Sequence, residues 1–460
     1  MKGWVNNVKK NRFEIDMCNG SIMDKLISFS LPLMVSGILQ LAFNAVDIIV
    51  VGRFSGSQAL AAVGSTTALI NVFTNLFIGI SLGANVLAAR FYAAGKDREM
   101  SETVHTSITL ALISGIMMAV IGVLLAKWAL EIMGTPDDVI GQSALYMRIY
   151  FMGMPFFMLY NYGAAILRAI GDTKRPLIFL IISGIANAAL NMTLVILFHM
   201  GVAGVAIGTI ISQLISCVLV LTCLYRSEGS YQLRFSKLKI NGAYMEQIFQ
   251  VGVPAGIQST VINLSNALLQ SSVNSFGEIT VAGNSAAANI EGFVYVAMNS
   301  LYQAAISFTG QNVGAGKYER VNRILYTAEA CVIVVGLVLG NGALFFGKQL
   351  LSIYTENPDV IDAGMKRMNV IARTYALCGM MDVMVGSLRG LGYSVMPMIV
   401  SLIGACGLRL LWIFTFFRME QFHTVTSLYL TYTWSWIITF SAHVICWIIV
   451  RRKLGRQWNS

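Results

Sequence analysis

The chain has 460 residues, of which 56% are hydrophobic and only 12% are charged, and its formal net charge is +10. A soluble domain is about 25% charged, so this chain lacks the polar residues to cover its own surface. Composition therefore indicates an integral membrane protein and argues against a large soluble one. The Lys and Arg residues cluster in short loops, so membrane topology explains the positive charge better than a nucleic-acid partner does.

Residues 1–24 are polar and basic and contain no apolar core of a signal peptide, so the first apolar run is expected to remain as a membrane helix. Twelve apolar runs follow, and most reach the roughly 20 residues that a spanning helix needs. They lie near 26–51, 60–88, 106–126, 145–166, 177–199, 202–225, 248–273, 280–309, 325–346, 368–388, 395–417 and 424–450. The predicted fold class is all-α integral membrane with twelve transmembrane helices.

The basic residues also predict the orientation. An even number of spans places both termini on one side of the membrane. Most of the 32 Lys and Arg residues lie on the side that holds the N-terminus. Because positively charged loops stay inside, both termini are predicted to be cytoplasmic.

The two halves of the chain repeat each other at a nearly constant offset. Pro32 in LPLMVSGILQ corresponds to Pro254 in VGVPAGIQST. At almost the same offset, Gly95 in YAAGKDRE corresponds to Gly316 in GAGKYER, and ILRAIGDTKRPLI corresponds to SLRGLGYSVMPMI. Each copy holds an even number of spans, so the repeats are parallel. We expect two six-helix bundles around a central cleft.

The predicted organisation has five parts. They are a cytoplasmic segment at 1–24, an N-lobe (spans 1–6) at 25–225, a linker at 226–247, a C-lobe (spans 7–12) at 248–450 and a cytoplasmic tail at 451–460. The apolar side chains of the linker would let it lie on the lobes or on the membrane surface, but a flexible tether is the simpler expectation. Two similar lobes suit alternating access.

The sequence lacks the common motifs of ATPases, hydrolases and zinc sites. It contains no Walker A motif, H-E-x-x-H or G-x-S-x-G, and its seven cysteines show no zinc-ligand spacing. We therefore predict a transporter and not an enzyme, with no cofactor. Its energy must come from an ion gradient, or it equilibrates its substrate.

Asp47 in FNAVDIIVVG lies in an otherwise apolar run. A carboxylate there costs about 2.5–3.5 kcal/mol even on lenient insertion scales, so it is a functional candidate by default. Gln40 and Asn44 precede it at spacings that place all three on one helix face. The second copy has Leu269 at the position of Asp47, and this asymmetry favours function over a role in building the fold.

Three more polar residues could meet Asp47 in the N-lobe. Asn187 and Asn191 in SGIANAALNMT lie four residues apart on one helix face, and Thr209 in GVAGVAIGT lies about two turns into the next helix. Carboxylate, amide and hydroxyl oxygens are the hard donors that Na⁺ prefers. The sequence predicts a possible Na⁺ site at these four residues, although Asp47 could equally bind and release a proton.

Other ionisable residues also lie within apolar runs. Glu291 and Asp382 are secondary candidates that function and structural ion pairing explain equally well. For Arg373 and Arg409 a structural role is favoured, because both lie toward the outer ends of their spans and could extend to the interface.

Several of these segments, in this order, resemble bacterial MATE (multidrug and toxic compound extrusion) transporters. The matching segments are LPLM with Asp47, AAVGSTTAL, ILRAIGDTKRP, GVAGVAIGT, VGVPAGIQS, GQNVGAGKYER and SLRGLGYSVMPM, within residues 24–450. The resemblance implies a multi-pass protein of the bacterial inner (plasma) membrane. It also implies efflux of organic cations or other amphipathic compounds in exchange for Na⁺ or H⁺.

Within that family the chain resembles the DinF-like branch more than the NorM-like branch. The DinF-like pattern has an Asp on the first helix, an Asn and an Asp on the fifth, a Thr on the sixth and a proline that bends the first helix. The corresponding residues here are Asp47, Asn187, Asn191, Thr209 and Pro32. Asn191 departs from the pattern, which removes one negative charge and leaves the ion and its stoichiometry open. The NorM-like branch has a carboxylate on the seventh helix, which span 7 lacks, and Asp382 matches its tenth-helix acid only weakly.

We therefore predict an antiporter in which Asp47 alternately binds Na⁺ or H⁺ and responds to a cationic amphipathic substrate. The alternative is a flippase or exporter of a lipid-linked or endogenous metabolite on the same scaffold. A pyrophosphate-linked cargo would need several cations in the cavity, and the spans of the first lobe hold few arginines. Besides the lipid bilayer and the substrate no partner is expected, since one chain supplies both lobes and a monomer suffices.

Overall fold

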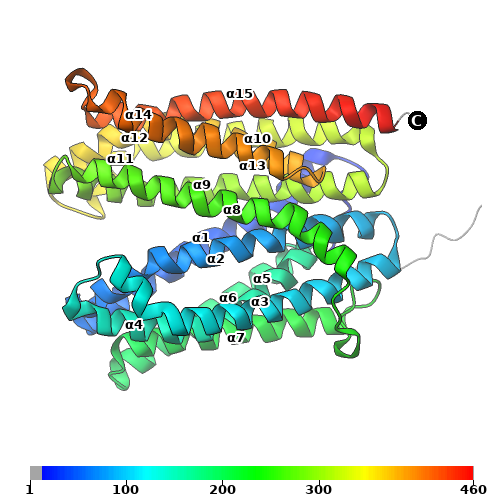
Figure 1. Cartoon of the computed structure of the whole chain (residues 1–460), viewed down its shortest axis with the longest axis horizontal. Helices are drawn as coiled ribbons and strands as arrows, with labels where there is room; N and C mark the ends of the chain where they lie inside the picture. The colour runs from blue at the N-terminus through cyan, green and yellow to red at the C-terminus, as the bar shows by residue number, and fades with distance from the viewer. Residues whose placement is uncertain (1–12, 459–460) are drawn as a thin grey trace, which may run out of the picture. The chain divides into compact units, whose positions relative to one another are not determined.

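The structure is a computed structural model that describes residues 13–458, and helices form nearly all of it (Figure 1). The long helices of the first half are α1 (Ile22–Phe54), α2 (Gly56–Ala93), α3 (Asp97–Ile132), α4 (Asp137–Met152), α5 (Met154–Ala169), α6 (Lys174–Met192) and α7 (Gly201–Arg226). The second half holds α8 (Gly242–Asn274), α9 (Glu278–Gly314), α10 (Tyr318–Phe345), α11 (Gly347–Ser352), α12 (Pro358–Gly390), α13 (Val395–Ser401), α14 (Leu408–Phe414) and α15 (Val425–Trp458).

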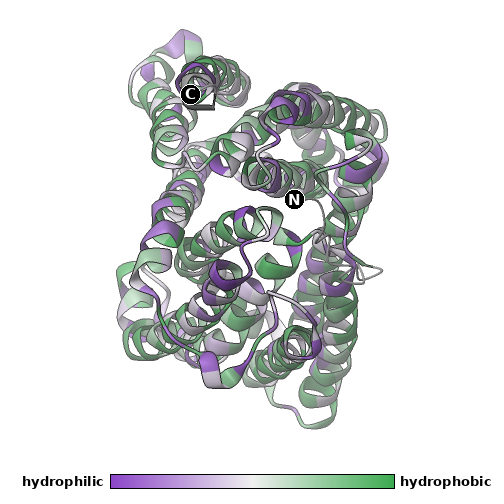
Figure 2. Cartoon of the chain, turned by 90° about the vertical axis from the view of Figure 1, so that its right-hand side faces the viewer, coloured by the Kyte–Doolittle hydropathy of each residue, from purple (hydrophilic) through white to green (hydrophobic). Residues whose placement is uncertain are grey.

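All twelve predicted spans coincide with helices. The fourth span is the pair α4 and α5, the fifth is α6 with a short π-helix (Thr193–Leu197), and the eleventh is α13 and α14 joined by a π-helix (Leu402–Gly407). Among the described residues, eight helical stretches are long and apolar enough to cross a membrane by length and composition alone. Hydrophobic residues cover most of the helices, and hydrophilic residues are more frequent at the turns (Figure 2).

The repeat is visible in the backbone of the turns. Three pairs of glycines with positive φ occupy corresponding turns, and the two members of each pair are separated by the same length of chain. They are Gly56 and Gly277 (φ 87° and 90°), Gly95 and Gly316 (66° and 68°), and Gly171 and Gly392 (93° and 85°). Glycine adopts this conformation without the steric cost that a Cβ brings. The two halves therefore turn in the same way at the same places.

The fourth span differs between the two halves. In the first half it breaks at Gly153 into α4 and α5, with Pro155 in the first turn of α5. A proline inside a helix removes a backbone hydrogen bond and collides with the preceding turn, so the helix ends before it. The corresponding positions of the second half are Thr374 and Ala376, and α12 runs through them without a break.

Contacts divide the chain into two compact units. Unit 1 comprises the chain up to Ser21, Leu39–Gly252 and Gly310–Gly316, and unit 2 comprises Ile22–Ile38, Val253–Thr309 and Lys317–Ser460. The two parts of α1 thus belong to different units, as do those of α8. Pro32 and Pro254 lie close to these two changeovers. The lobe boundaries at 25–225 and 248–450 stay a prediction. They were derived from the sequence repeat, whereas the two units are defined by contacts between residues.

The linker is packed against unit 1, so the expectation of a flexible tether is wrong and its placement on a lobe is correct. Leu233 is fully buried. The backbone N–H of Arg234 donates to Nε2 of His105 on α3 (3.0 Å), and the Asn241 amide donates to the carboxylate of Glu102, also on α3 (2.7 Å). These bonds hold both ends of the linker to one helix, which ties the start of α8 to unit 1.

The segment before α1 is also docked on unit 1. The Glu14 carboxylate accepts hydrogen bonds from the hydroxyls of Tyr92 (2.9 Å) and Tyr231 (2.7 Å), which belong to α2 and the linker. Met17 is fully buried, and its carbonyl accepts a hydrogen bond from the Asn312 amide near the end of α9 (3.0 Å). The predicted cytoplasmic segment 1–24 therefore has a structural role from residue 13 onward. Residues 1–12 lie outside the described residues.

Gly171 allows a test of this docking. Its φ is 93°, and a Cβ there would lie 2.5 Å from the carbonyl oxygen of Ile15. Gly171→Ala is expected to destabilise the protein and to release the segment, measured by thermal melting and by proteolysis of the N-terminus. Gly95→Ala is the matched control, because Gly95 also has positive φ but has no neighbouring atom within 4 Å.

Both variants carry the backbone strain of roughly 1–2 kcal/mol, so their difference reports the contact with Ile15 alone. Equal melting temperatures and equal proteolysis for the two variants would show that the segment does not rest on Gly171 in solution.

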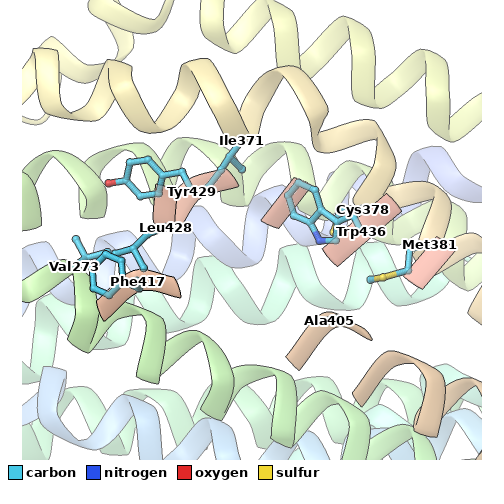
Figure 3. Packing of buried hydrophobic residues seen from close by; sticks show 9 residues of the cluster. All are labelled: Val273, Ile371, Cys378, Met381, Ala405, Phe417, Leu428, Tyr429 and Trp436. Atoms are coloured by element: carbon cyan, nitrogen blue, oxygen red, sulfur yellow. The ribbon is translucent and has the colours of Figure 1, made fainter. Parts of the chain in front are cut away.

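Unit 2 contains a core of buried side chains from α8, α12, α15 and the segments between α13 and α15. The core comprises Val273, Ile371, Cys378, Met381, Ala405, Phe417, Leu428, Tyr429 and Trp436 (Figure 3). Lipid tails are as apolar as these side chains, so close packing rather than transfer from water stabilises the cluster.

Candidate functional site

Close contact between α1 and α6 positions Asp47. The ring of Phe43 lies directly on Gly184, where a Cβ would overlap it. Asp47 follows Phe43 by one helical turn, and Asn187 follows Gly184 by about one turn. Side chains three or four residues apart share a helix face, so this contact aligns the polar residues of both helices.

Asn191 joins the polar residues into a network. Its Nδ2 donates to Oδ1 of Asp47 (2.5 Å) and to Oδ1 of Asn187 (3.3 Å). Asn191 is fully buried, Asn187 is buried and Asp47 is half-buried. The structure therefore brings together three of the four residues predicted for the pocket. A hydrogen bond to a carboxylate is stronger than one between neutral groups, so Asp47 orients the amide.

A second glycine controls the position of Asn191. A Cβ at Gly208 on α7 would overlap Oδ1 of Asn191, so only glycine leaves room for this amide. Among the described residues Oδ1 of Asn191 has no hydrogen-bond partner. Buried polar oxygens are normally paired, and such an exception calls for an explanation. An amide oxygen next to a carboxylate is an oxygen donor available to a cation.

Within the described chain, the remaining predicted residues form no hydrogen bond with Asp47, Asn187 or Asn191. The Thr209 hydroxyl donates to the backbone carbonyl of Val205 (2.9 Å), so it is engaged within α7, although it is adjacent to Gly208. Gln40 and Asn44 are exposed. Their part in the site stays a prediction.

Pro32 is buried within α1, which continues through it from Ile22 to Phe54. Proline cannot donate to the preceding turn, which weakens the helix locally. The Ser36 hydroxyl donates to the Pro32 carbonyl (2.8 Å). This position is suited to a bend, but the role assigned to Pro32 stays a prediction.

The sequence prediction missed several residues around Asp47. Gly184 and Gly208 create the close helix contacts, and small residues at helix interfaces were the available signal. Tyr146 and Tyr150 on α4 lie within electrostatic range of Asp47 and stack on each other with ring centroids 6.1 Å apart. Their spacing of four residues places both on one face, which the sequence already showed.

The secondary candidates in unit 2 separate into two sites. Glu291 on α9 forms a buried salt bridge with Arg367 on α12 (2.7 Å), and Arg367 also donates to the Asn284 amide oxygen (2.8 Å). This geometry supports the structural explanation of Glu291. Asp382 lies elsewhere on α12, half-buried and hydrogen-bonded to Tyr295.

Arg409 corrects another expectation. It does not extend to the interface: only 4% of it is exposed, and its Nε donates to the Ser435 hydroxyl (2.9 Å). Its guanidinium carbon lies 4.2 Å from the ring centroid of Tyr432. Arg373 is exposed, as a residue at an interface would be.

Comparison with known proteins decides the family. The family model MatE matches residues 32–193 and again residues 254–415. The chain belongs to the MatE family. The two matches begin at Pro32 and Pro254, the prolines that mark the repeat in the sequence. The MATE fold also confirms the predicted class, an all-α membrane protein with two repeats, and these transporters are not enzymes.

Relatives cover most of the chain. "Probable multidrug resistance protein YoeA" of Bacillus subtilis is 28% identical over 396 residues, which is 84% of this chain and 85% of the relative. "Probable multidrug resistance protein YpnP" of the same organism is 27% identical, with coverage of 86% and 88%.

A solved structure shows the same fold. The outward-facing conformation of a multidrug resistance MATE family transporter superposes with a TM-score of 0.89 at 18% identity, and it covers 97% of this chain and 100% of the other. At this identity the likeness concerns the fold alone.

Proposed function

We propose that this MATE transporter is a secondary antiporter that exports amphipathic organic compounds, organic cations among them, in exchange for Na⁺ or H⁺. The observation that carries the proposal is Asp47, which is half-buried in a membrane helix and bound by a fully buried amide. In the described part of the chain it takes part in no salt bridge. A buried carboxylate without a fixed cation must be neutralised by a mobile one.

The mobile cation can be a proton, Na⁺ or the charged group of a substrate. Because these compete for one carboxylate, binding of the coupling ion favours release of a cationic substrate. A ligand shifts a conformational equilibrium by its difference in affinity between the two states, so exchange at Asp47 provides the coupling. For Na⁺, rotation of the Asn191 amide would present Oδ1 to an ion held by Asp47, with Asn187 as a further oxygen donor.

The proposal also covers the branch of the family, the lobe boundaries, the orientation in the membrane and the class of substrate. The pattern of Asp47, Asn187, Thr209 and Pro32 supports the DinF-like branch, from which Asn191 departs. The repeat supports an N-lobe at 25–225 and a C-lobe at 248–450, and the distribution of basic residues supports cytoplasmic termini in a bacterial plasma membrane. The names of the B. subtilis relatives support drug-like small molecules as substrates.

The proposal is tested with purified protein in liposomes loaded with a fluorescent organic cation. A Na⁺ gradient and a pH gradient are imposed separately, and movement of the dye is followed in each. Movement driven by one gradient establishes antiport and names the ion. Movement that is independent of both gradients would contradict antiport. No movement under either gradient would favour the alternative, a flippase or exporter of lipid-linked or endogenous metabolites.

Gly208→Ala tests the role of Asn191 without changing a polar group. The added methyl group displaces the Asn191 amide from Asp47, so we expect gradient-driven export to fall by roughly tenfold or more, since losing a hydrogen bond to a charged group costs about 1.5–3 kcal/mol. Gly64→Ala on α2 is the control, because no atom lies within 4 Å of its Cβ position. Wild-type export by Gly208→Ala would remove Asn191 from the proposed pocket.

A further inference from the structure

The linker between the two repeats carries one half of an exposed aromatic pair. Phe235 begins a short 3₁₀ turn (Phe235–Lys237) and stacks on Tyr225 in the last turn of α7, with ring centroids 5.7 Å apart and ring planes at 25°. Phe235 remains 54% exposed and Tyr225 remains 52% exposed. Aromatic side chains at the end of a spanning helix are typical of the interface between membrane and water.

The exposed face of α7 places this pair at the surface of the bilayer. Leu214, Val218 and Tyr225 are all exposed, and their spacing of four and seven residues puts them on one side of the helix. Leu214 and Val218 lie in the apolar body of a helix long enough to cross a membrane, where exposed aliphatic side chains contact lipid tails. Tyr225 continues the same face about 10 Å farther along the helix, which is the level of the lipid headgroups.

The segment that presents Phe235 is fixed to unit 1. Leu233 is fully buried, and its backbone N–H donates to the Leu224 carbonyl of α7 (3.0 Å). The backbone N–H of Arg234 donates to Nε2 of His105 (3.0 Å). The ring of Phe235 is therefore held outward in a defined position, and little conformational entropy is lost when it binds.

Basic residues outnumber acidic ones in the same stretch. Residues 226–240 contain four basic side chains and one acidic side chain, all of them exposed: Arg226, Arg234, Lys237, Lys239 and Glu228. Within the described chain none of the four basic side chains forms a salt bridge. Arg226 directly follows Tyr225 in the chain, and Arg234 directly precedes Phe235. Unpaired basic side chains next to a membrane are attracted to anionic lipids.

We propose that the linker binds the headgroups of anionic phospholipids. The rings of Phe235 and Tyr225 lie at the level of the headgroups, and Arg226, Arg234 and Lys237 bind the lipid phosphates. The occupant of this surface is lipid and not another protein, because the same face of α7 continues into the apolar body of the membrane helix. Binding requires neither a gradient nor a substrate, so the inference does not rest on the proposed antiport.

The position of Phe235 is tested with the purified full chain in phosphatidylcholine nanodiscs that contain phosphatidylglycerol. Phe235→Trp adds one fluorophore to the seven native tryptophans, and the signal of the wild type is subtracted. The added fluorescence is expected to be quenched by lipids with brominated acyl chains and to be protected from iodide in the water. Quenching by iodide and not by brominated lipid would place Phe235 in water or at a site for a soluble partner, and would overturn the proposal.

The preference for anionic lipid is tested with the same chain in detergent. Phosphatidylglycerol or phosphatidylcholine is titrated, and the rise in melting temperature gives the half-saturating concentration of each lipid. The wild type is expected to bind phosphatidylglycerol at least tenfold more tightly, and this preference should weaken as potassium chloride screens the charges. Equal half-saturating concentrations of the two lipids would overturn the proposal.

Variants assign the preference to the linker. Arg234→Gln and Lys237→Gln are each expected to reduce it about fivefold, the effect of one basic residue near an anionic surface. Lys348→Gln, which removes an exposed lysine of α11, is the matched control and should keep the preference. Because all three side chains are exposed, the variants should melt like the wild type when no lipid is added. An equal loss in Lys348→Gln would show that net charge alone attracts the lipid, and it would overturn the assignment to the linker.

Discussion

Asp47→Asn is expected to abolish gradient-driven export while the protein still folds and inserts in the membrane. Asparagine has nearly the same shape as aspartate and can bond with Asn191, but it cannot carry the negative charge that a proton, Na⁺ or a cationic substrate neutralises. Losing a charge-assisted interaction of about 1.5–3 kcal/mol weakens ion binding by roughly ten- to hundredfold. Dye export from liposomes under the effective gradient measures this loss.

Asn44→Ala is the matched control for Asp47→Asn. Asn44 lies one turn earlier on α1 and is exposed, so its loss should leave export within about twofold of the wild type. Surface expression and melting temperature of both variants distinguish loss of coupling from loss of folding. Export by Asp47→Asn at the wild-type rate would refute the proposed role of this carboxylate.

Glu291→Gln is expected to have the largest effect on stability. It leaves the Arg367 guanidinium buried in unit 2 without its carboxylate, and breaking a buried ion pair in this way costs about 3–5 kcal/mol. The double variant Glu291→Gln/Arg367→Gln removes both charges and should recover much of the loss. Thermal melting in detergent, with Asp47-dependent export measured in parallel, checks both variants.

The surface pair Lys127 and Glu131 provides the comparison. Its charged atoms are 3.8 Å apart and both side chains are more than half exposed, so Glu131→Gln should change stability by less than about 1 kcal/mol. If Glu291→Gln melted like Glu131→Gln, the pair of Glu291 and Arg367 would not be a stabilising contact. A direct role of Glu291 and Arg367 in transport would then be the better explanation of this pair.

Local patterns in the sequence were sufficient for the fold. Apolar runs predicted twelve segments that are helical in the structure, because a helix in lipid must satisfy its own backbone and be apolar along its length. The repeat followed from prolines and glycines such as Gly95 and Gly316, whose backbone conformations in the structure agree within a few degrees. Asp47 was identified because a carboxylate in an apolar run is costly wherever the helix lies.

Only the tertiary structure decided which helix faces meet. Helical periodicity places Asn187 and Asn191 on one face, but contact with Asp47 depends on the ring of Phe43 resting on Gly184, which no periodicity encodes. For the same reason the structure, and not the sequence, showed that Thr209 bonds within its own helix.

Long-range pairing was equally hidden in the sequence. Glu291 and Arg367 are 76 residues apart in the chain. The position of Arg409 near the end of a span suggested that its side chain extends to the interface, but the structure buries it. Spacing along the chain determines which residues share a helix face. Which other helix packs against that face depends on close packing among several helices at once. In such a contact, one glycine or one aromatic ring decides which polar groups meet.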